Sequence, residues 1–195
     1  MKKLIGIIVV ICVIFTFFGC ASKPKGVTPQ GNERKVPTSF PDFIKKAISK
    51  APDDVLIGIG TARLASLSQS RTVSATRARA EISRQMSTMI QDMVRDYQAS
   101  SEIDIDSAVS FQENITVALS QSNLVGSAVV EEDRDSEGNV WTVVMMGKTD
   151  VAKEISQAQS LAKLRVPAMA SFDAEERMNA AFDRIYAQEL QVNDR

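Results

Sequence analysis

Two glycines one residue apart, Gly58 and Gly60, place the strongest constraint on how this chain can fold. They lie in an apolar run, residues 55–62, that is predicted to be a β-strand. Alternation along a strand directs both glycines to one face, together with Leu56 and Ala62. The opposite face carries three branched side chains: Val55, Ile57 and Ile59. The glycine face therefore forms a shallow groove that a helix can approach closely.

Paired glycines after an apolar run can also form a phosphate-binding loop. A dinucleotide loop has the pattern G-x-G-x-x-G and opens directly into a helix. Here Arg63 occupies the position of the third glycine, and no Gly-Lys-Ser/Thr of a P-loop follows. We therefore expect Gly58 and Gly60 to serve close packing.

A long helix is predicted over residues 68–97, because apolar side chains recur on one face at a spacing of 3.6 residues. These are Ala75, Ala78, Ile82, Met86, Met89, Ile90, Met93 and Tyr97. The small residues Ala75 and Ala78 would let its N-terminal part lie close to the sheet.

The arginines of this helix need separate placement. Arg77 is expected in solvent, where Glu81 can pair with it. Arg71 and Arg79 lie nearer the apolar face and need an acidic partner or a route to water. They do not indicate nucleic-acid binding, because acidic residues outnumber basic ones over residues 51–195 and no aromatic stacking platform accompanies them.

A second helix and a hairpin are predicted after a break at residues 100–106. The helix has apolar residues at helical spacing and is expected to lie on the sheet beside the long helix: Ala108, Phe111, Ile115 and Leu119. Residues 124–132 and 140–148 are predicted as two strands, joined by a turn that contains Gly138. The stretch from Asp133 to Gly138 imitates an EF-hand loop, but Val144 occupies the twelfth position, so calcium binding is not expected.

The second strand of this hairpin is apolar on both faces, so the sheet needs cover on two sides. Trp141, Val143 and Met145 alternate with Val140, Val144 and Met146. Two sources of cover for the second face are open: the C-terminal helices, or a second copy of the protein.

Further helices flank this unit, so the predicted fold class is α+β, with a small antiparallel sheet and helices upon it. A short helix is predicted after Pro41. In the C-terminal tail, residues 151–195, helices are predicted over 151–164 and 173–190, with Pro167 between them. Asp173 and Glu176 match a capping box. The last helix is amphipathic and either folds back on the sheet or binds a partner.

The N-terminal 19 residues are predicted to be an export signal. Two lysines precede an apolar run, residues 4–18, that is short for a bilayer span. Gly19 and Cys20 resemble a lipobox, in which the signal is cut between these two residues and Cys20 receives the lipid. An uncut single-span anchor is the alternative. Residues 20–40 are rich in Pro, Gly and Lys and are predicted to be a disordered tether.

The composition excludes many kinds of catalysis. The chain has no histidine, and its two cysteines, Cys12 and Cys20, lie in the first twenty residues. Its clustered carboxylates, Asp104 with Asp106 and those of residues 131–135, are expected to be solvated charges near turns. We expect no catalytic residues, no metal site, no cofactor and no small-molecule substrate.

Residues 41–150 resemble the Lpp-twenty family of bacterial lipoproteins. The resemblance is carried by "FPDFI", "LIGIGTARLASLSQSRTVSATRARAEISRQM", "DYQ" and "VVEEDRDSEGNVWTVVMMGK". It implies a small antiparallel sheet crossed by a long helix, without catalytic residues. It also implies a relation to lipoproteins that form outer-membrane rings around the flagellar motor, and similar small folds occur in lipoproteins that activate penicillin-binding proteins.

The expected function is therefore structural. The chain is expected to be a lipid-anchored protein with its domain in the periplasm or at the cell surface. The resemblance to lipoprotein sorting signals implies the outer membrane, because Ala21 and not an aspartate follows Cys20. Self-association or binding of an envelope protein would be its role. The alternative is a periplasmic regulator of a peptidoglycan synthase.

Overall fold

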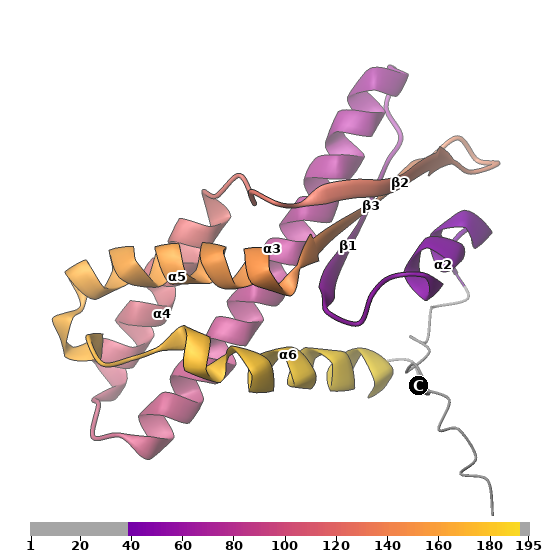
Figure 1. Ribbon diagram of the computed structural model, residues 1–195. Helices are drawn as coiled ribbons and strands as arrows, with labels where there is room; N and C mark the ends of the chain where they lie inside the picture. The colour runs from indigo at the N-terminus through magenta and orange to yellow at the C-terminus, as the bar shows by residue number, and fades with distance from the viewer. Residues whose placement is uncertain (1–38, 192–195) are drawn as a thin grey trace, which may run out of the picture. The chain divides into compact units, whose positions relative to one another are not determined.

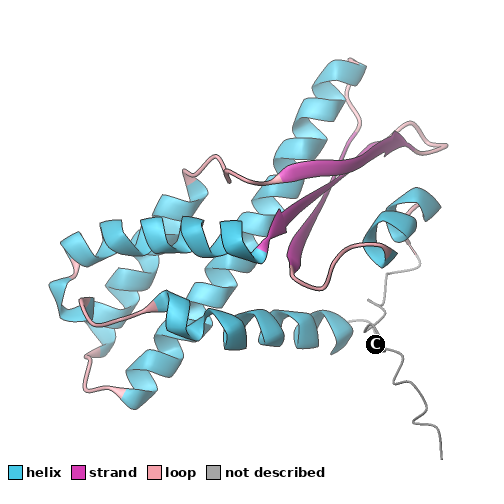
Figure 2. Ribbon diagram, viewed as in Figure 1, coloured by secondary structure: helices cyan, strands magenta, loops and turns pink. Residues whose placement is uncertain are grey.

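The computed structural model describes residues 39–191, as five α-helices, one short 3-10 helix and three strands (Figures 1 and 2). The expected signal, Gly19, Cys20 and nearly all of the expected tether lie outside the described residues. In chain order the elements are α2 (Asp42–Ser49), β1 (Val55–Ala62), α3 (Leu67–Ser100), α4 (Ile105–Ser120), β2 (Ala128–Arg134), β3 (Val140–Gly147), α5 (Lys148–Arg165), η2 (Pro167–Met169) and α6 (Ala174–Gln191). The predicted α+β class is confirmed.

The three strands form an antiparallel sheet in the order β1-β3-β2. In the register of β1 and β3, Gly58 lies opposite Val144, and Gly60 lies opposite Thr142. Opposed residues share a face of a sheet, so both glycines and their partners face the same layer. That layer is helix α3, which crosses β1 and β3 (Figure 1).

The two glycines are where α3 meets the sheet. A methyl group added at Gly58 would overlap the carbonyl oxygen of Ala78, and one added at Gly60 would overlap that of Ser74. The backbone of α3 therefore rests directly on the backbone of β1, without side chains between them. A pair of larger residues would hold the two elements apart.

Helix α3 is about 50 Å long and serves two layers. Its N-terminal half lies on the sheet, and its C-terminal half packs against α4, α5 and α6 (Figure 1). The residues predicted for its apolar face are buried from Ala78 to Met93, whereas Ala75 is only half-buried. The sheet-facing row follows steps of four residues instead: Ser70, Ser74, Ala78 and Ile82.

The main core is formed by α3 with α4, α5, α6 and the α3-facing side of the sheet. The residues predicted for the buried face of α4, from Ala108 to Leu119, are all buried. However, α4 and α6 pack on α3 and α5, so neither lies on the sheet as expected. Phe172 joins these helices, with its ring edge-on to Tyr97 at 5.4 Å and to Phe111 at 5.2 Å.

Helix α2 covers the second face of the sheet. Ile44 and Ile48 pack with Val55, Ile57 and Val143 in a smaller core. The C-terminal helices, one of the two sources of cover that the sequence suggested, were therefore the wrong choice for this face. The sequence did predict the short helix itself, but not its position.

Replacement of Gly58 by alanine tests the helix–sheet contact. We expect Gly58→Ala to lower the free energy of unfolding by about 3 kcal/mol, because the new methyl group meets backbone atoms that cannot rotate away. Urea unfolding followed by circular dichroism measures the change. Gly147→Ala is the matched control, since its methyl group would meet no atom within 4 Å and its φ of -68° suits alanine. Equal effects of the two substitutions would contradict the contact described here.

Candidate functional site

A polar chain, buried at Ser74 and Thr142, links α3 to the two strands of the hairpin. The hydroxyl groups of Ser74 and Thr142 are 2.6 Å apart, and Ser74 donates to the carbonyl of Arg71. The exposed Arg71 in turn pairs with Glu132 of β2, with Nε and Oε1 2.9 Å apart. Thr142 also donates to Oε2 of Glu132 at 3.5 Å, so the group connects α3 with both strands of the hairpin.

The arginines find partners that the sequence only partly indicated. Arg71 has the acidic partner it needs, and Arg79 donates to the hydroxyl of Ser127 at 3.2 Å. The expected pair of Glu81 with Arg77 was wrong: Glu81 pairs with Arg84, and Arg77 donates to the carbonyl oxygen of Thr61. An arginine three residues away satisfies Glu81 because positions i and i+3 are also neighbours on a helix.

Asp135 organises the hairpin turn. Its carboxylate accepts hydrogen bonds from the backbone N–H groups of Glu137 and Asn139, from the Asn139 amide and from the Trp141 indole at 2.8 Å. Donation by Asn139 and Trp141 lowers the pKa of Asp135 to about 2. Both carboxylate oxygens are occupied by donors from the protein, so this EF-hand-like stretch is a turn built around one aspartate.

The other noted carboxylates have local roles. Asp104 caps α4 by accepting from the backbone N–H of Ser107 at 2.8 Å, and this bond lowers its pKa. Asp173 caps α6 by accepting a hydrogen bond from the backbone N–H of Glu175. In a capping box the donor would be the N–H of the next residue, Glu176. Among residues 39–191, no three acidic side chains lie close enough together to hold a metal ion.

The two edges of the sheet differ, and neither suits an added strand. On β1, the outward carbonyl of Ile57 accepts from the Gln85 amide at 2.9 Å, and that of Thr61 accepts from Arg77. On β2, a bulge between Val129 and Glu131 interrupts the register, and charged residues follow it. Bulges and charges are common means of preventing edge-to-edge pairing.

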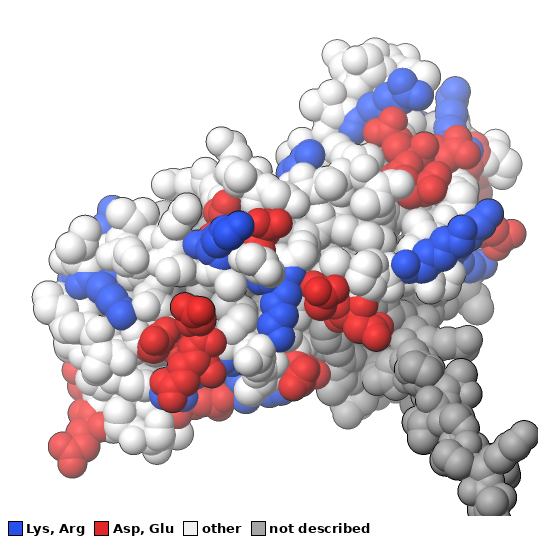
Figure 3. Space-filling model, viewed as in Figure 1, with Lys and Arg blue, Asp and Glu red and all other residues white. Residues whose placement is uncertain are grey.

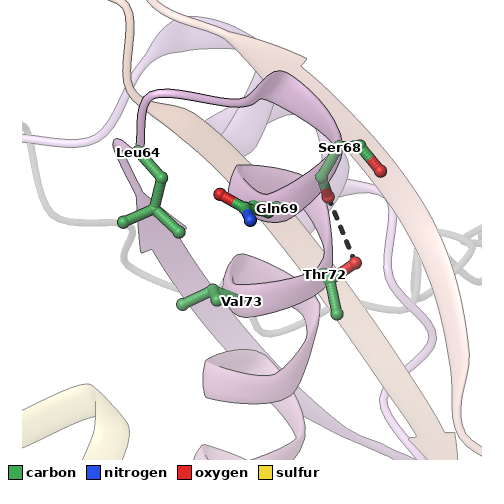
Figure 4. Close-up of a pocket in the computed structure, with 5 residues that line it drawn as sticks. All are labelled: Leu64, Ser68, Gln69, Thr72 and Val73. Carbon is green, nitrogen blue, oxygen red and sulfur yellow. Dashed lines mark hydrogen bonds between the residues drawn. The ribbon is translucent and has the colours of Figure 1, made fainter.

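A shallow, open hollow lies beside the first turns of α3 (Figure 4). Leu64 and Val73 line it, with the Gln69 side chain between them. The Thr72 hydroxyl donates to the carbonyl of Ser68, within the helix, so it is not directed at a ligand. The hollow lacks the converging polar groups of a small-molecule site.

The most unusual surface is the solvent side of α4 and α5, which we call the α4–α5 face. Helix α4 has no lysine or arginine, and apolar residues lie on its outer side as well as in the core. The exposed fractions are 48% for Val117, 58% for Leu161 and 81% for Leu164. Ile105 and Val109 of α4 are also exposed. In Figure 3 the surface at the left, over the C-terminal end of α5, carries a basic group among uncharged residues. Exposed apolar residues in contiguous groups mark protein or membrane contacts.

This face was not predicted from the sequence, although a signal was present. The apolar stripe of α4 accounts for the residues that are buried within the chain. The remaining positions include only two charges, Asp106 and Glu113, where a solvent face usually carries more.

Comparison with known protein families and with curated proteins gives no match for this sequence. Within the described part of the chain, no helix combines the length and the apolar composition needed to cross a bilayer.

The low pKa of Asp135 leads to a test by pH. Ionised Asp135 stabilises the fold fully above its ordinary pKa of 3.8, and this contribution is lost as the pH falls from about 4 to about 2. We expect Asp135→Asn to be less stable than the wild type at pH 7 and to lose less stability over that interval. Urea unfolding at several pH values, followed by fluorescence of the single tryptophan, measures both. Asp53→Asn, on an exposed turn, is the control; an identical pH response of all three proteins would exclude the role of Asp135.

Proposed function

We propose that this chain is a non-catalytic assembly protein of the bacterial cell envelope, attached to the outer membrane by a lipid on Cys20. A charged start, a short apolar run and the Gly19-Cys20 pair support the attachment. Several acyl chains on one residue give nearly permanent anchoring, since each buried CH2 contributes about 0.8 kcal/mol. The domain would then present a protein-binding surface close to that membrane.

The observation that carries the assembly role is the α4–α5 face. Large apolar side chains exposed together on a surface mark contacts with a protein or a membrane. One side of α4 is buried against α3 and α5, whereas Val109 and Val117 on its other side are about half exposed. A protein partner would remove this second side from water.

The chemistry of the chain agrees with a binding role. It has no histidine, and both cysteines precede the folded part. Asp104, Asp135 and Asp173 are engaged in caps and turns, and Glu132 is paired with Arg71. These carboxylates therefore already have local structural partners.

The resemblance to the Lpp-twenty family supports the same proposal. The order of strand, long helix, second helix and hairpin agrees with the fold that the resemblance implies. Relatives that form rings at the flagellar motor would make this chain a component of such an assembly. A regulator of a peptidoglycan synthase is the alternative, and it shares the anchor and the binding surface.

Metabolic labelling tests the anchor. We expect the wild-type chain, produced in a bacterium, to incorporate radioactive palmitate and to sediment with outer membranes. Cys20→Ser should lose the label and leave the outer-membrane fraction. Cys12→Ser is the matched control and should behave as the wild type, because Cys12 leaves with the signal. Unlabelled wild-type chain would reject lipid anchoring.

Cross-linking in living cells followed by mass spectrometry separates the two roles. Copies of the chain together with flagellar basal-body proteins would support assembly. A penicillin-binding protein as the main cross-linked product would support the regulator and reject the assembly role.

A further inference from the structure

The α4–α5 face has a fixed internal register. Arg165 at the end of α5 donates to the side chain of Asn114 at 2.8 Å. Near the other end of the pair, Glu154 accepts from the Ser122 hydroxyl and from the N–H of Val125. The two helices are therefore antiparallel, with Asn114 level with Arg165 and Ser122 level with Glu154.

Val117 and Leu161 lie between these two levels. Val117 is one turn beyond Asn114, and Leu161 is one turn before Arg165. Positions 154, 158, 161 and 165 share one side of α5, the side that faces α4. Both side chains are about half exposed, so they flank the groove between the helices from its solvent side.

The charges on this face are divided between the two helices. The charged residues of α4 are Asp106 and Glu113, both exposed and both acidic. On α5 the basic residues are Lys148, Lys153, Lys163 and Arg165. Lys153 pairs with Asp150 at 3.1 Å, and Arg165 lies on the side that faces α4, where it contacts Asn114. Beside the groove, α4 therefore carries the acidic Glu113, and α5 carries the basic Arg165 at the same level.

We propose that the α4–α5 face binds a second copy of this chain, with α4 of each copy packed on α5 of the other. A twofold contact between identical copies must be complementary to itself, and a face with the acidic Glu113 on one helix and the basic Arg165 on the other meets this condition. Rotation about a twofold axis parallel to the helices leaves each residue at the same height along that axis. It places Val117 against Leu161 of the second copy, and Glu113 near its Arg165.

The size of the face sets the strength of this contact. Two helices of this length cover about 25 Å by about 20 Å, a footprint of about 500 Å². That lies toward the small end of specific interfaces, so the dimer is weak when the chains are free. Here the inference depends on the proposed function: anchoring both copies in one membrane raises their effective concentration and favours the dimer.

Disulfide cross-linking in cells tests the arrangement. Two differently tagged full-length chains, both with Cys12→Ser, are produced together; one carries Val117→Cys and the other Leu161→Cys. After mild oxidation we expect a band that holds both tags, about tenfold stronger than the band from the pair Leu64→Cys and Leu161→Cys. Leu64 is the matched control, because it is 46% exposed but lies before α3, away from this face. Chains without added cysteines give the background.

Charge exchange provides a second measurement. We expect Glu113→Arg to weaken the mixed-tag band several-fold, and Arg165→Glu to do the same. Both substitutions in one chain should restore it, which a merely misfolded chain would not do. No band from the 117/161 pair, equal bands from the control pair, or cross-linking of residue 117 only to a different protein would each overturn the second-copy contact.

Palmitate labelling of the same cells distinguishes failure of the proposed lipid anchor from failure of the proposed second-copy contact. A cross-link between chains that carry no palmitate retains the second-copy contact and rejects the lipid anchor. Labelled chains without a cross-link retain the anchor and reject the contact.

Discussion

The structure depends on a backbone-to-backbone contact between β1 and α3. At Gly58 and Gly60 the carbonyl oxygens of Ala78 and Ser74 occupy the space that side chains would fill. This contact fixes the height of α3 above the sheet. Only at that height does the Ser74 hydroxyl reach Thr142, and only there do Gln85 and Arg77 reach the outward carbonyls of β1.

Because α3 continues beyond the sheet, its position also determines where the other helices pack. Beyond the sheet, α3 continues through Met86, Met89 and Met93, which are fully buried among α4, α5 and α6. Methionine is unbranched and fills irregular spaces, which suits a helix that meets three others at different angles. The buried Gln159 then fixes the turn into α6, since it donates to the carbonyl of Phe172 and accepts from the N–H of Ala174.

Much of this fold could be predicted from the sequence, because its elements differ clearly in period. The strand at residues 55–62 was predicted with its observed bounds, and the buried residues of α4 were predicted as they occur. Ala75 was predicted for the buried face of α3 and Ser74 was not, because a hydrophobic pattern includes only apolar residues. Ser74 is buried all the same, since its hydroxyl has a buried partner in Thr142. The position of α2 could not be derived, since an eight-residue amphipathic helix fits either side of a sheet.

The candidate face was harder to predict for a physical reason. Periodicity identifies the side of a helix that is buried within one chain, and it assigns the remaining side to solvent. Val117 and Leu161 belong to that remaining side, so a single chain's pattern cannot say what covers them. The proposed lipidation at Cys20, by contrast, depends on a short linear motif and needs no fold to be predicted.

The attachment of α2 has a mechanical consequence. Phe40 lies near the N-terminal end of the described residues, and its ring is edge-on to Trp141 with 5.8 Å between the ring centroids. A mechanical force applied from the N-terminal side would therefore act on α2 first. This helix is held by a small core with Ile44 and Ile48 at its centre, whereas the main core spans four helices and the sheet. Under tension α2 would detach before the rest unfolds, exposing Val55, Ile57 and Val143 and changing the surroundings of Trp141. The domain thus contains a weak link whose opening would uncover an apolar sheet face while the α4–α5 face stays intact.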